Sequence, residues 1–391
     1  MIKHKKLIII CLTAVPLTMV LGNSMLLPEL PYLASVLEVT QLQIGLLISS
    51  FSFSGGLAIP LLGYLSDKYN RKKILLSSLI IYGSGGIIAG LLALIASPKY
   101  YNYILGARII QGIGAGGTYP LAIALTGDIF AKQERNQALG SLEAANAGGK
   151  VISPFLGAFI ALLFWPGLFF IYPLLTFPLA LMLYYFIPAS QPATITISFK
   201  DYLTQLIDII AEQKYKFFVC LATAVVALFI FFGVLSFVSK TLTATYNIIG
   251  LTRASLIALP ILSLVITAHL IGRYLKLNKP ALNLLLSGGL VLNAIALLTL
   301  PFIDGLILYL ALIACLGIGN GIILTVLNTI FASSSTETYR GGLSSIYGSM
   351  RFLGIALGPP AFAILNQIST LTMFIVPAGL AMLLSLMSLL L

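Results

Sequence analysis

Charged side chains are rare in the long apolar stretches of this sequence, and the few that occur there could do chemistry. They are Glu29, Arg108, Glu143, Lys150 and Arg351. A charged group is costly inside a membrane and usually belongs to an ion pathway, a proton relay or a ligand site. A carboxylate there can carry a proton, and a cation can bind an anion or neutralise a neighbouring acid. These residues therefore predict proton transfer or ligand binding within a membrane.

The depth of each charge follows from its place along the helix that would hold it. At about 1.5 Å per residue, Lys150 lies about 21 Å and Arg351 about 15 Å along their helices, near the middle of the membrane. Glu29 and Arg108 fall in the outer third, and Glu143 falls in the inner third on the same helix face as Lys150. Glu143 is equally compatible with a proton relay and with a structural role.

The remaining charges gather in short clusters between the apolar stretches. The sharpest cluster is GYLSDKYNRKK, residues 63–73, in which turn-forming residues and charges separate two apolar runs. An aspartate and several cations are not stable in hydrocarbon, so this segment is predicted to be a loop at the membrane surface.

Composition indicates a polytopic membrane protein. Of the 391 residues, 59% are hydrophobic and 8% are charged, which is far from the composition of soluble domains. The net charge of +11 is divided among clusters between apolar segments, which indicates membrane topology rather than nucleic-acid binding. The three cysteines lack metal-ligand spacing, and the sequence has no phosphate-binding glycine loop. No metal or cofactor is therefore predicted, and a gradient is the expected source of energy.

Apolar segments of about 20 residues, the length that a helix needs to cross a bilayer, occur along the whole chain. They are 7–29, 41–65, 74–96, 102–130, 137–160, 166–187, 217–239, 252–272, 282–302, 305–330, 342–366 and 370–391. Each run is too long and too evenly apolar for a barrel strand, so the predicted fold is all-α with twelve transmembrane helices. The first run follows a basic start, MIKHKK, and is expected to be an uncleaved helix.

The loops are asymmetric in charge. With the amino terminus in the cytoplasm, lysine and arginine favour the cytoplasmic loops by about five to one. This bias predicts a multi-pass membrane protein with both termini in the cytoplasm. The longest gap, residues 188–216, is predicted to be a cytoplasmic linker between six-helix bundles at residues 1–187 and 217–391.

Internal repetition supports two related bundles. A shift of 205 residues places Gly112, Gly114 and Gly116 on Gly317, Gly319 and Gly321, Arg135 on Arg340, Gly149 on Gly354, and Pro154 on Pro359. Coincidences at corresponding positions of corresponding helices are typical of a duplicated six-helix unit. The second copy of the charged loop begins at Gly272 and has Lys276 where the first has an aspartate, so the halves are not expected to be functionally equivalent.

Four stretches resemble motifs of the major facilitator superfamily of secondary transporters. Residues 63–73 are similar to its loop signature, with Asn70 in the place of a glycine, where asparagine would tolerate a left-handed backbone. The first helix ends GNSMLLPELP, similar to the Pro-x-x-Pro exit of drug/proton antiporters. Residues 108–116, RIIQGIGAG, are similar to the motif R-x-x-Q-G-x-G-A. Residues 149–157, GKVISPFLG, resemble the antiporter motif G-x-x-x-G-P-x-x-G, which GIALGP at 354–359 repeats.

The resemblance implies a fold of two pseudo-symmetric six-helix bundles and a role for each motif. It implies helix packing for the antiporter-motif residues Gly149, Ser153, Pro154, Gly157, Gly354, Gly358 and Pro359. It also implies a conformational latch of Gly63, Asp67, Arg71 and Asp128, in which the arginine pairs with both acids in one conformation only. The alternative is that these charges only fix the topology.

The resemblance also packs the first and fourth helices together, which would bring Glu29 to Arg108. Separation of the two would let Glu29 take a proton, and reunion would expel it. The alternative is that Glu29 is wet, close to the outer surface. Substrate would bind near the midplane, and the candidate cavity residues are Asn23, Gln111, Asn146, Lys150 and Arg351.

The sequence thus predicts a secondary active transporter that exports small lipophilic or drug-like compounds in exchange for protons by alternating access. Its partners would be a small-molecule substrate, protons and the lipid bilayer, without nucleic acid. An exporter of an anionic or zwitterionic metabolite or lipid is the alternative within transport, because Lys150 and Arg351 place positive charge at mid-depth. A receptor or channel fits the repeat less well, and an enzyme fits least.

Overall fold

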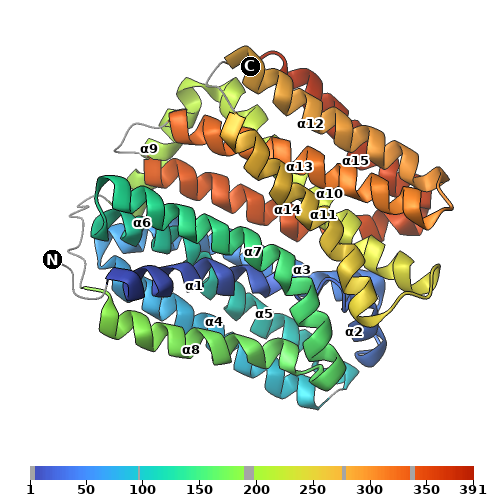
Figure 1. Cartoon of the computed structure of the whole chain (residues 1–391), viewed down its shortest axis with the longest axis horizontal. Helices are drawn as coiled ribbons and strands as arrows, with labels where there is room; N and C mark the ends of the chain where they lie inside the picture. Colours follow the sequence, from blue (N-terminus) through green and yellow to red (C-terminus); the bar gives the residue numbers. More distant parts are fainter. Residues whose placement is uncertain (1–4, 96, 189–197, 275–278, 335–339) are drawn as a thin grey trace. The chain divides into compact units, whose positions relative to one another are not determined.

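The computed structural model describes residues 5–95, 97–188, 198–274, 279–334 and 340–391, and within these ranges the chain is helical, with no strand (Figure 1). The helices are α1 (Lys5–Ser24), α2 (Leu30–Val36), α3 (Gln41–Lys68), α4 (Arg71–Leu94), η1 (Pro98–Tyr100), α5 (Tyr101–Gly116), α6 (Tyr119–Ile129), α7 (Lys132–Phe164), α8 (Gly167–Phe186), α9 (Phe199–Glu212), α10 (Lys214–Ala244), α11 (Gly250–Tyr274), α12 (Lys279–Thr299), η2 (Leu300–Phe302), α13 (Leu306–Ser334), α14 (Arg340–Ile368) and α15 (Thr370–Ser388). In the described ranges, 12 helical stretches are long and apolar enough to cross a membrane. The predicted all-α fold with twelve spans is confirmed.

Two compact units divide the chain. Unit 1 comprises residues 1–39 and 50–205, and unit 2 comprises residues 40–49 and 206–391. The boundary between residues 205 and 206 falls inside the predicted linker, in the helix α9. Residues 189–197 of that linker lie outside the described residues.

The first predicted span is interrupted near its end. We expected one helix over residues 7–29, but α1 ends at Ser24 and α2 begins at Leu30. Pro28 and Pro31 explain the difference, since proline has no backbone N–H and restrains the residue before it from helical geometry. Glu29 therefore lies in the connection before α2 rather than on α1, and its side chain is buried, with 5% exposure. The expectation that Glu29 lies on the first helix was wrong, and its burial contradicts the alternative that it is exposed to water.

The fourth span is also divided into two helices. α5 ends at Gly116, and α6 starts at Tyr119 after the turn residues Gly117 and Thr118. Pro120 cannot donate the helical hydrogen bond to the carbonyl of Gly116, and glycine has a low helix propensity, so the helix breaks here. Tyr119, whose contact is described below, is the first residue of α6 after this break.

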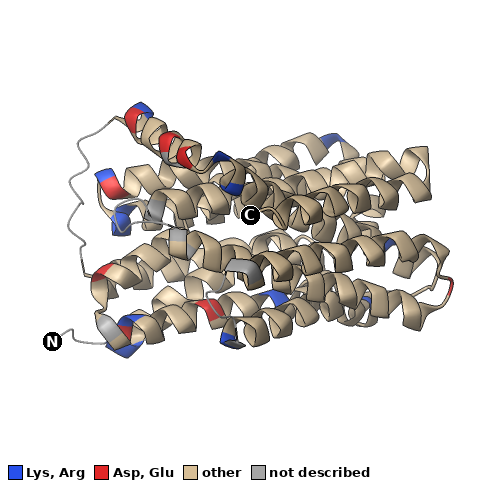
Figure 2. Ribbon diagram, turned by 90° about the horizontal axis from the view of Figure 1, so that it is seen from above, with Lys and Arg blue, Asp and Glu red and all other residues tan. Residues whose placement is uncertain are grey.

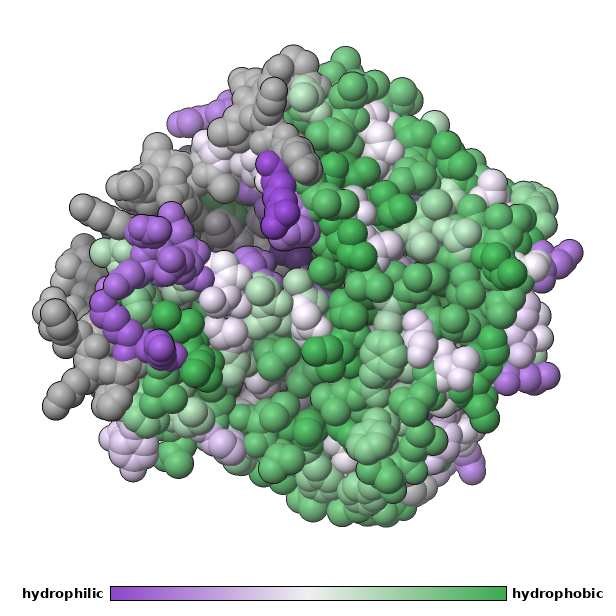
Figure 3. Space-filling view, in the orientation of Figure 1, coloured by the Kyte–Doolittle hydropathy of each residue, from purple (hydrophilic) through white to green (hydrophobic). Residues whose placement is uncertain are grey.

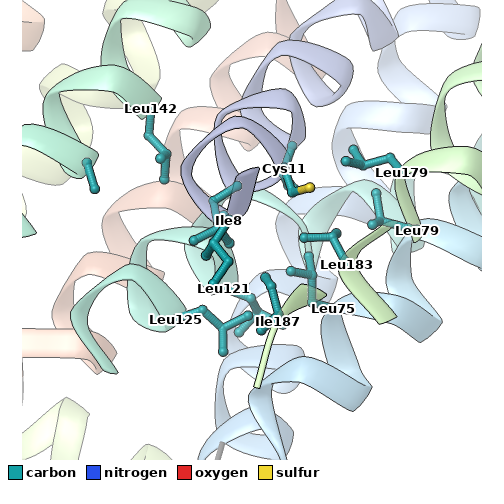
Figure 4. Close-up of a cluster of buried hydrophobic side chains, with 14 of the residues drawn as sticks. Ile8, Cys11, Leu75, Leu79, Leu121, Leu125, Leu142, Leu179, Leu183 and Ile187 are labelled. Atoms are coloured by element: carbon teal, nitrogen blue, oxygen red, sulfur yellow. The ribbon is translucent and has the colours of Figure 1, made fainter. Parts of the chain in front are cut away.

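Unit 1 has an apolar core around the first half of α1. Ile8 and Cys11 of α1 meet Leu75 and Leu79 of α4, and Leu183 of α8 lies against the same cluster (Figure 4). Leucines of α6 and α7 complete the cluster. Burial of such side chains contributes about 1.5–3 kcal/mol each, so this core fixes the helices that carry the charged loop.

Charged residues lie mainly at helix ends, and long stretches of helix carry none (Figure 2). The face of the molecule shown in Figure 3 is largely apolar, with hydrophilic residues gathered toward its edges. Both features are expected of helices that are exposed to lipid along their length.

Candidate functional site

Arg71 lies between two carboxylates in unit 1. Its Nη2 is 2.7 Å and its Nε 3.2 Å from Oδ1 of Asp67, and its Nη1 is 2.6 Å from Oδ1 of Asp128. The three side chains come from the end of α3, the start of α4 and the end of α6. Both acids are thus bound by one guanidinium through charge-assisted hydrogen bonds, which are stronger than neutral ones. We call Asp67, Arg71 and Asp128 the Arg71 cluster.

Local turns around the Arg71 cluster are built by short polar side chains. Asn70 caps α4, because its side chain accepts a hydrogen bond from the backbone N–H of Lys73. Its φ of −140° is extended, so the expectation of a left-handed backbone at this residue was wrong. Asparagine is favoured here for its capping oxygen. Ser66 donates to the carbonyl of Gly63 within the last turns of α3.

Lys72 has a role that the sequence did not reveal. Its Nζ donates to the carbonyls of Tyr184 and Ile187, at 2.7 and 2.5 Å. These carbonyls end α8 and have no helical donor, so a cation satisfies them and interacts favourably with the helix dipole. Lys72 therefore fastens α8 to α4 instead of binding a ligand.

Arg108 lies fully buried in unit 1, at the end of α1. Its Nη2 donates to the carbonyl of Gly22 and to Oδ1 of Asn23, and its Nη1 donates to Oε1 of Gln111, at 2.7–2.8 Å. Phe51 places its ring 4.5 Å from the guanidinium carbon. Because α1 ends at Ser24, the carbonyl of Gly22 needs an external donor, and Arg108 supplies it.

Two predicted cavity residues, Asn23 and Gln111, belong to this buried network. Asn23 also donates from Nδ2 to Ser52 Oγ at 2.6 Å. Tyr172 donates to the carbonyl of Gly22 at 3.2 Å, beside the bond from Arg108. Asn23 thus joins the end of α1 to α3 and α5, Tyr172 joins it to α8, and Gln111 orients Arg108. The proton-coupling role predicted for Arg108 with Glu29 stays a prediction.

The long helix α7 carries the other charges of unit 1. Glu143 is exposed, and its Oε1 accepts a hydrogen bond from the hydroxyl of Tyr119, the first residue of α6. Lys150, two turns further along the helix, is half-buried, and Asn146 between them is buried. The structure thus links Glu143 to the break in the fourth span. The sequence singled out Glu143 but not Tyr119, because a lone tyrosine carries no motif.

The antiporter-motif residues lie at close helix crossings. A Cβ at Gly149 would approach Leu17 Cδ1 to 2.9 Å, and one at Gly157 would collide with the carbonyl of Met25. Between them, the hydroxyl of Ser153 donates to the carbonyl of Gly149 within α7. Small residues let α7 approach α1 closely, as is common in membrane helices.

The repeat of the motif does the same in unit 2. A Cβ at Gly354 would collide with the carbonyl of Val225, and one at Gly358 would come within 2.7 Å of the carbonyl of Phe229, both on α10. Pro154 and Pro359, which match at the 205-residue shift, are both buried inside their helices. α7 therefore packs on α1 in the same way as α14 packs on α10, with motif glycines at the helix crossing.

Arg351 of α14 is the one predicted cavity residue in unit 2. Its guanidinium carbon lies 5.5 Å from the centre of the Tyr347 ring, and the side chain is partly exposed. Tyr347 in turn stacks on Phe331 of α13, with ring centres 4.5 Å apart. Among the described residues, Arg351 makes no ion pair with a carboxylate.

The described residues offer no group of three or more His, Cys, Asp or Glu side chains that could hold a metal ion. The charged and polar groups of the Arg71 cluster, the Arg108 network and α7 are instead suited to pair with one another, to exchange protons or to bind an organic ligand.

Comparison with known proteins agrees with this architecture. The family model described as Major Facilitator Superfamily matches residues 12–359. The "Bacillibactin exporter" of Bacillus subtilis is 33% identical over 372 residues, which cover 95% of this chain and 92% of that protein. "Multidrug resistance protein 2" of the same organism is 28% identical over 160 residues, 41% of this chain and 38% of that protein.

A solved structure described as a D-xylose-proton symporter superimposes on 97% of this chain and 96% of its own, with a TM-score of 0.76 and 15% identity. That likeness concerns the fold alone. The family model covers most of the chain, and the protein is accordingly a multi-pass membrane transporter of the Major Facilitator Superfamily.

Proposed function

We propose that the protein is a secondary active exporter of small organic molecules, driven by exchange for protons through alternating access. Its place would be a bacterial inner membrane, with both termini in the cytoplasm. The observation that carries the proposal is the 33% identity to an exporter along 95% of the chain. Small lipophilic or drug-like compounds are one substrate class, supported by the partial likeness to a multidrug resistance protein.

The Arg71 cluster supports alternating access. Arg71 binds carboxylates at the ends of α3 and α6. These bonds stabilise the conformation in which the two helix ends are close, and they are lost when the ends move apart. A device of this kind biases one conformation over another, as the sequence resemblance implies for the latch. A static pore would not need it.

Proton exchange requires a carboxylate that can lose its partner. Asp67 and Asp128 are both bound by Arg71. Two further acids of unit 1 lie outside this cluster: Glu29 is buried beside the start of α2, and Glu143 is exposed on α7. We propose Glu29 as the proton carrier and Glu143 as its alternative. Substrate-induced proton release from the solubilised protein should disappear in Glu29→Gln while substrate still binds. Full release in that variant would transfer the role to Glu143.

Inside-out membrane vesicles test the function itself. Vesicles that contain the protein should accumulate bacillibactin or the lipophilic cation ethidium when their lumen is acidified, and a protonophore should release the accumulated compound. Vesicles prepared without the protein control for passive binding. Equal uptake with and without the proton gradient would contradict a proton-driven exporter.

A second substrate class is favoured by a specific observation. The half-buried cation Arg351 has no carboxylate partner among the described residues. A negatively charged metabolite would neutralise it, and a neutral or cationic drug would not. In the vesicle assay, uptake of the anion 2-naphthoate compared with uptake of the cation ethidium separates these classes.

A further inference from the structure

Arg351 lies deep in the membrane-spanning part of unit 2. It follows the first residue of α14 by 11 positions, so it lies about 16 Å along the helix. The span that contains it runs from Gly342 to Ile368. Ser344 and Gly348 lie on the same face of α14 as Arg351, about two turns and one turn before it. This face therefore carries small side chains between the start of the helix and Arg351.

The charge of Arg351 has no acidic counterpart in the spans of unit 2. The described acidic residues of this unit are Asp208, Glu212 and Asp304, and all three lie outside the spans. An arginine at this depth without an anion is strongly unfavourable, unless water or a ligand reaches it. Its side chain is partly exposed, so the protein does not enclose it completely.

The charge is also not a requirement of the fold. At the 205-residue shift that superposes the motif glycines, the residue of α7 that corresponds to Arg351 is Asn146. Asn146 is neutral and 7% exposed. The two bundles pack α7 and α14 in the same way, so this packing does not require a cation at the position of Arg351.

The neighbouring side chains hold Arg351 in place and add a donor. Tyr347 lies one turn earlier on the same face, under the guanidinium, and its ring stacks on Phe331 at an angle of 21°. Phe331 in turn contacts Phe217 of α10, with ring centres 5.9 Å apart. The hydroxyl of Tyr347 is buried, with 6% exposure of the residue, and has no hydrogen-bond partner among the described residues.

Among the described residues, the Tyr347 hydroxyl has no hydrogen-bond partner, and the guanidinium of Arg351, 5.5 Å from the centre of that ring, has no carboxylate partner; together they point to a charged acceptor. A buried hydroxyl without a partner costs about 1–3 kcal/mol, and a carboxylate would satisfy it together with the guanidinium. The planar fork of arginine matches a carboxylate with two parallel hydrogen bonds. A phenylalanine and tyrosine stack keeps the surroundings apolar, which strengthens these bonds.

We propose that Arg351 and the hydroxyl of Tyr347 form a subsite for the carboxylate of an organic anion that the transporter carries. The inference rests on the proposed function, because it assumes that the ligand is a substrate. It assigns the substrate class: a small apolar molecule with a carboxylate group binds in unit 2, and its uncharged amide does not.

A matched pair of probes tests the subsite by binding. 2-Naphthoate and 2-naphthamide have the same ring system and differ in charge, and their affinities for the purified full-length protein are measured by calorimetry in detergent. We expect 2-naphthoate to bind at least about tenfold more weakly to Arg351→Gln, and about threefold more weakly to Tyr347→Phe. Arg351→Lys should recover part of the loss, because it keeps the charge without the fork.

The control variant is Lys240→Gln, which removes a cation near the end of α10 and should bind 2-naphthoate as the wild type does. Equal affinity of the wild type for 2-naphthoate and 2-naphthamide, or no binding of 2-naphthoate, would overturn the proposal. Unchanged 2-naphthoate binding in Arg351→Gln would also overturn it.

Chemical protection covers the case in which the variants fail to fold. Phenylglyoxal modifies arginine side chains, and mass spectrometry of the wild-type protein reports the modification of Arg351. 2-Naphthoate should slow this modification, whereas 2-naphthamide should not, and equal rates with both would contradict the subsite. The proposed function fails separately: vesicles without proton-dependent uptake of any compound would refute export, even where 2-naphthoate protects Arg351.

Discussion

Replacing Asp67 with asparagine removes the carboxylate that accepts two hydrogen bonds from Arg71, at 2.7 and 3.2 Å. The side chain keeps its size, and Arg71 keeps its contact with Asp128 at 2.6 Å. The variant should therefore insert and fold, while the arrangement that holds α3, α4 and α6 together loses part of its stabilisation.

The stabilisation lost in Asp67→Asn depends on how far solvent reaches the charged side chains of the Arg71 cluster. A hydrogen bond to a charged group contributes about 1.5–3 kcal/mol when it is shielded. The Arg71 and Asp67 side chains are each 24% exposed, and Asp128 is 35% exposed. Solvent screening therefore reduces the loss toward about 1.5 kcal/mol. A change of that size shifts a two-state equilibrium about tenfold.

The assay compares Asp67→Asn with a matched ion-pair variant. Glu134→Gln removes the partner of Lys5, but those side chains are 54% and 41% exposed, so the pair contributes little. We expect proton-driven uptake in vesicles to fall several-fold in Asp67→Asn and to stay near wild type in Glu134→Gln, at equal protein levels. Wild-type uptake in both Asp67→Asn and Arg71→Ala would refute the latch and leave these charges with a topological role.

Three further changes probe other contacts. Gly157→Ala should lower the stability by about 2 kcal/mol in thermal unfolding, because its Cβ meets a backbone carbonyl, whereas Gly148→Ala on the same helix has open space and should not. Tyr119→Phe and Glu143→Gln should each slow transport, and the double variant should be no slower than either, unless the two side chains act independently. Burial and the negative charge of Asp67 raise the pKa of Tyr202 to about 12. Its folded pKa exceeds the unfolded value of 10, so stability should fall as the pH rises from 10 to 12, and less so in Tyr202→Phe.

Much of the fold was predictable, because it depends on hydrophobic length. A bilayer demands about 20 apolar residues for each helix, and the spans follow directly from the sequence. The interruptions at Pro28 and at Gly117 were not predicted as helix breaks. Both sit inside apolar runs, and proline and glycine are tolerated in membrane helices, so composition does not reveal where a helix breaks.

The candidate site was predictable where charge pairs with charge. Asp67, Arg71 and Asp128 were singled out from a motif, and the structure brings them within hydrogen-bond distance. Partners without a motif were missed, such as Tyr119 beside Glu143. A side chain that bonds to a backbone carbonyl is invisible in sequence, because every residue has a carbonyl.

This is why the sequence did not reveal the role of Lys72, and why Arg108 was predicted only as a partner of Glu29 and not as the donor to a helix end. The end of a helix determines which carbonyls need a donor, and that end was displaced by the break after Ser24. The contacts of Arg351 depend on Phe331, 20 residues away on another helix, and no spacing in the sequence indicates such a stack.

Proton movement coupled to substrate movement tests the central claim most directly. Proteoliposomes that contain the wild-type protein, the pH-sensitive dye pyranine and bacillibactin are diluted into substrate-free buffer at the same pH. A proton-coupled exporter exchanges outgoing substrate for incoming protons, so the lumen should acidify, and Asp67→Asn should slow the acidification. Loss of bacillibactin from the lumen without a change of pH, or with alkalinisation, would contradict proton antiport.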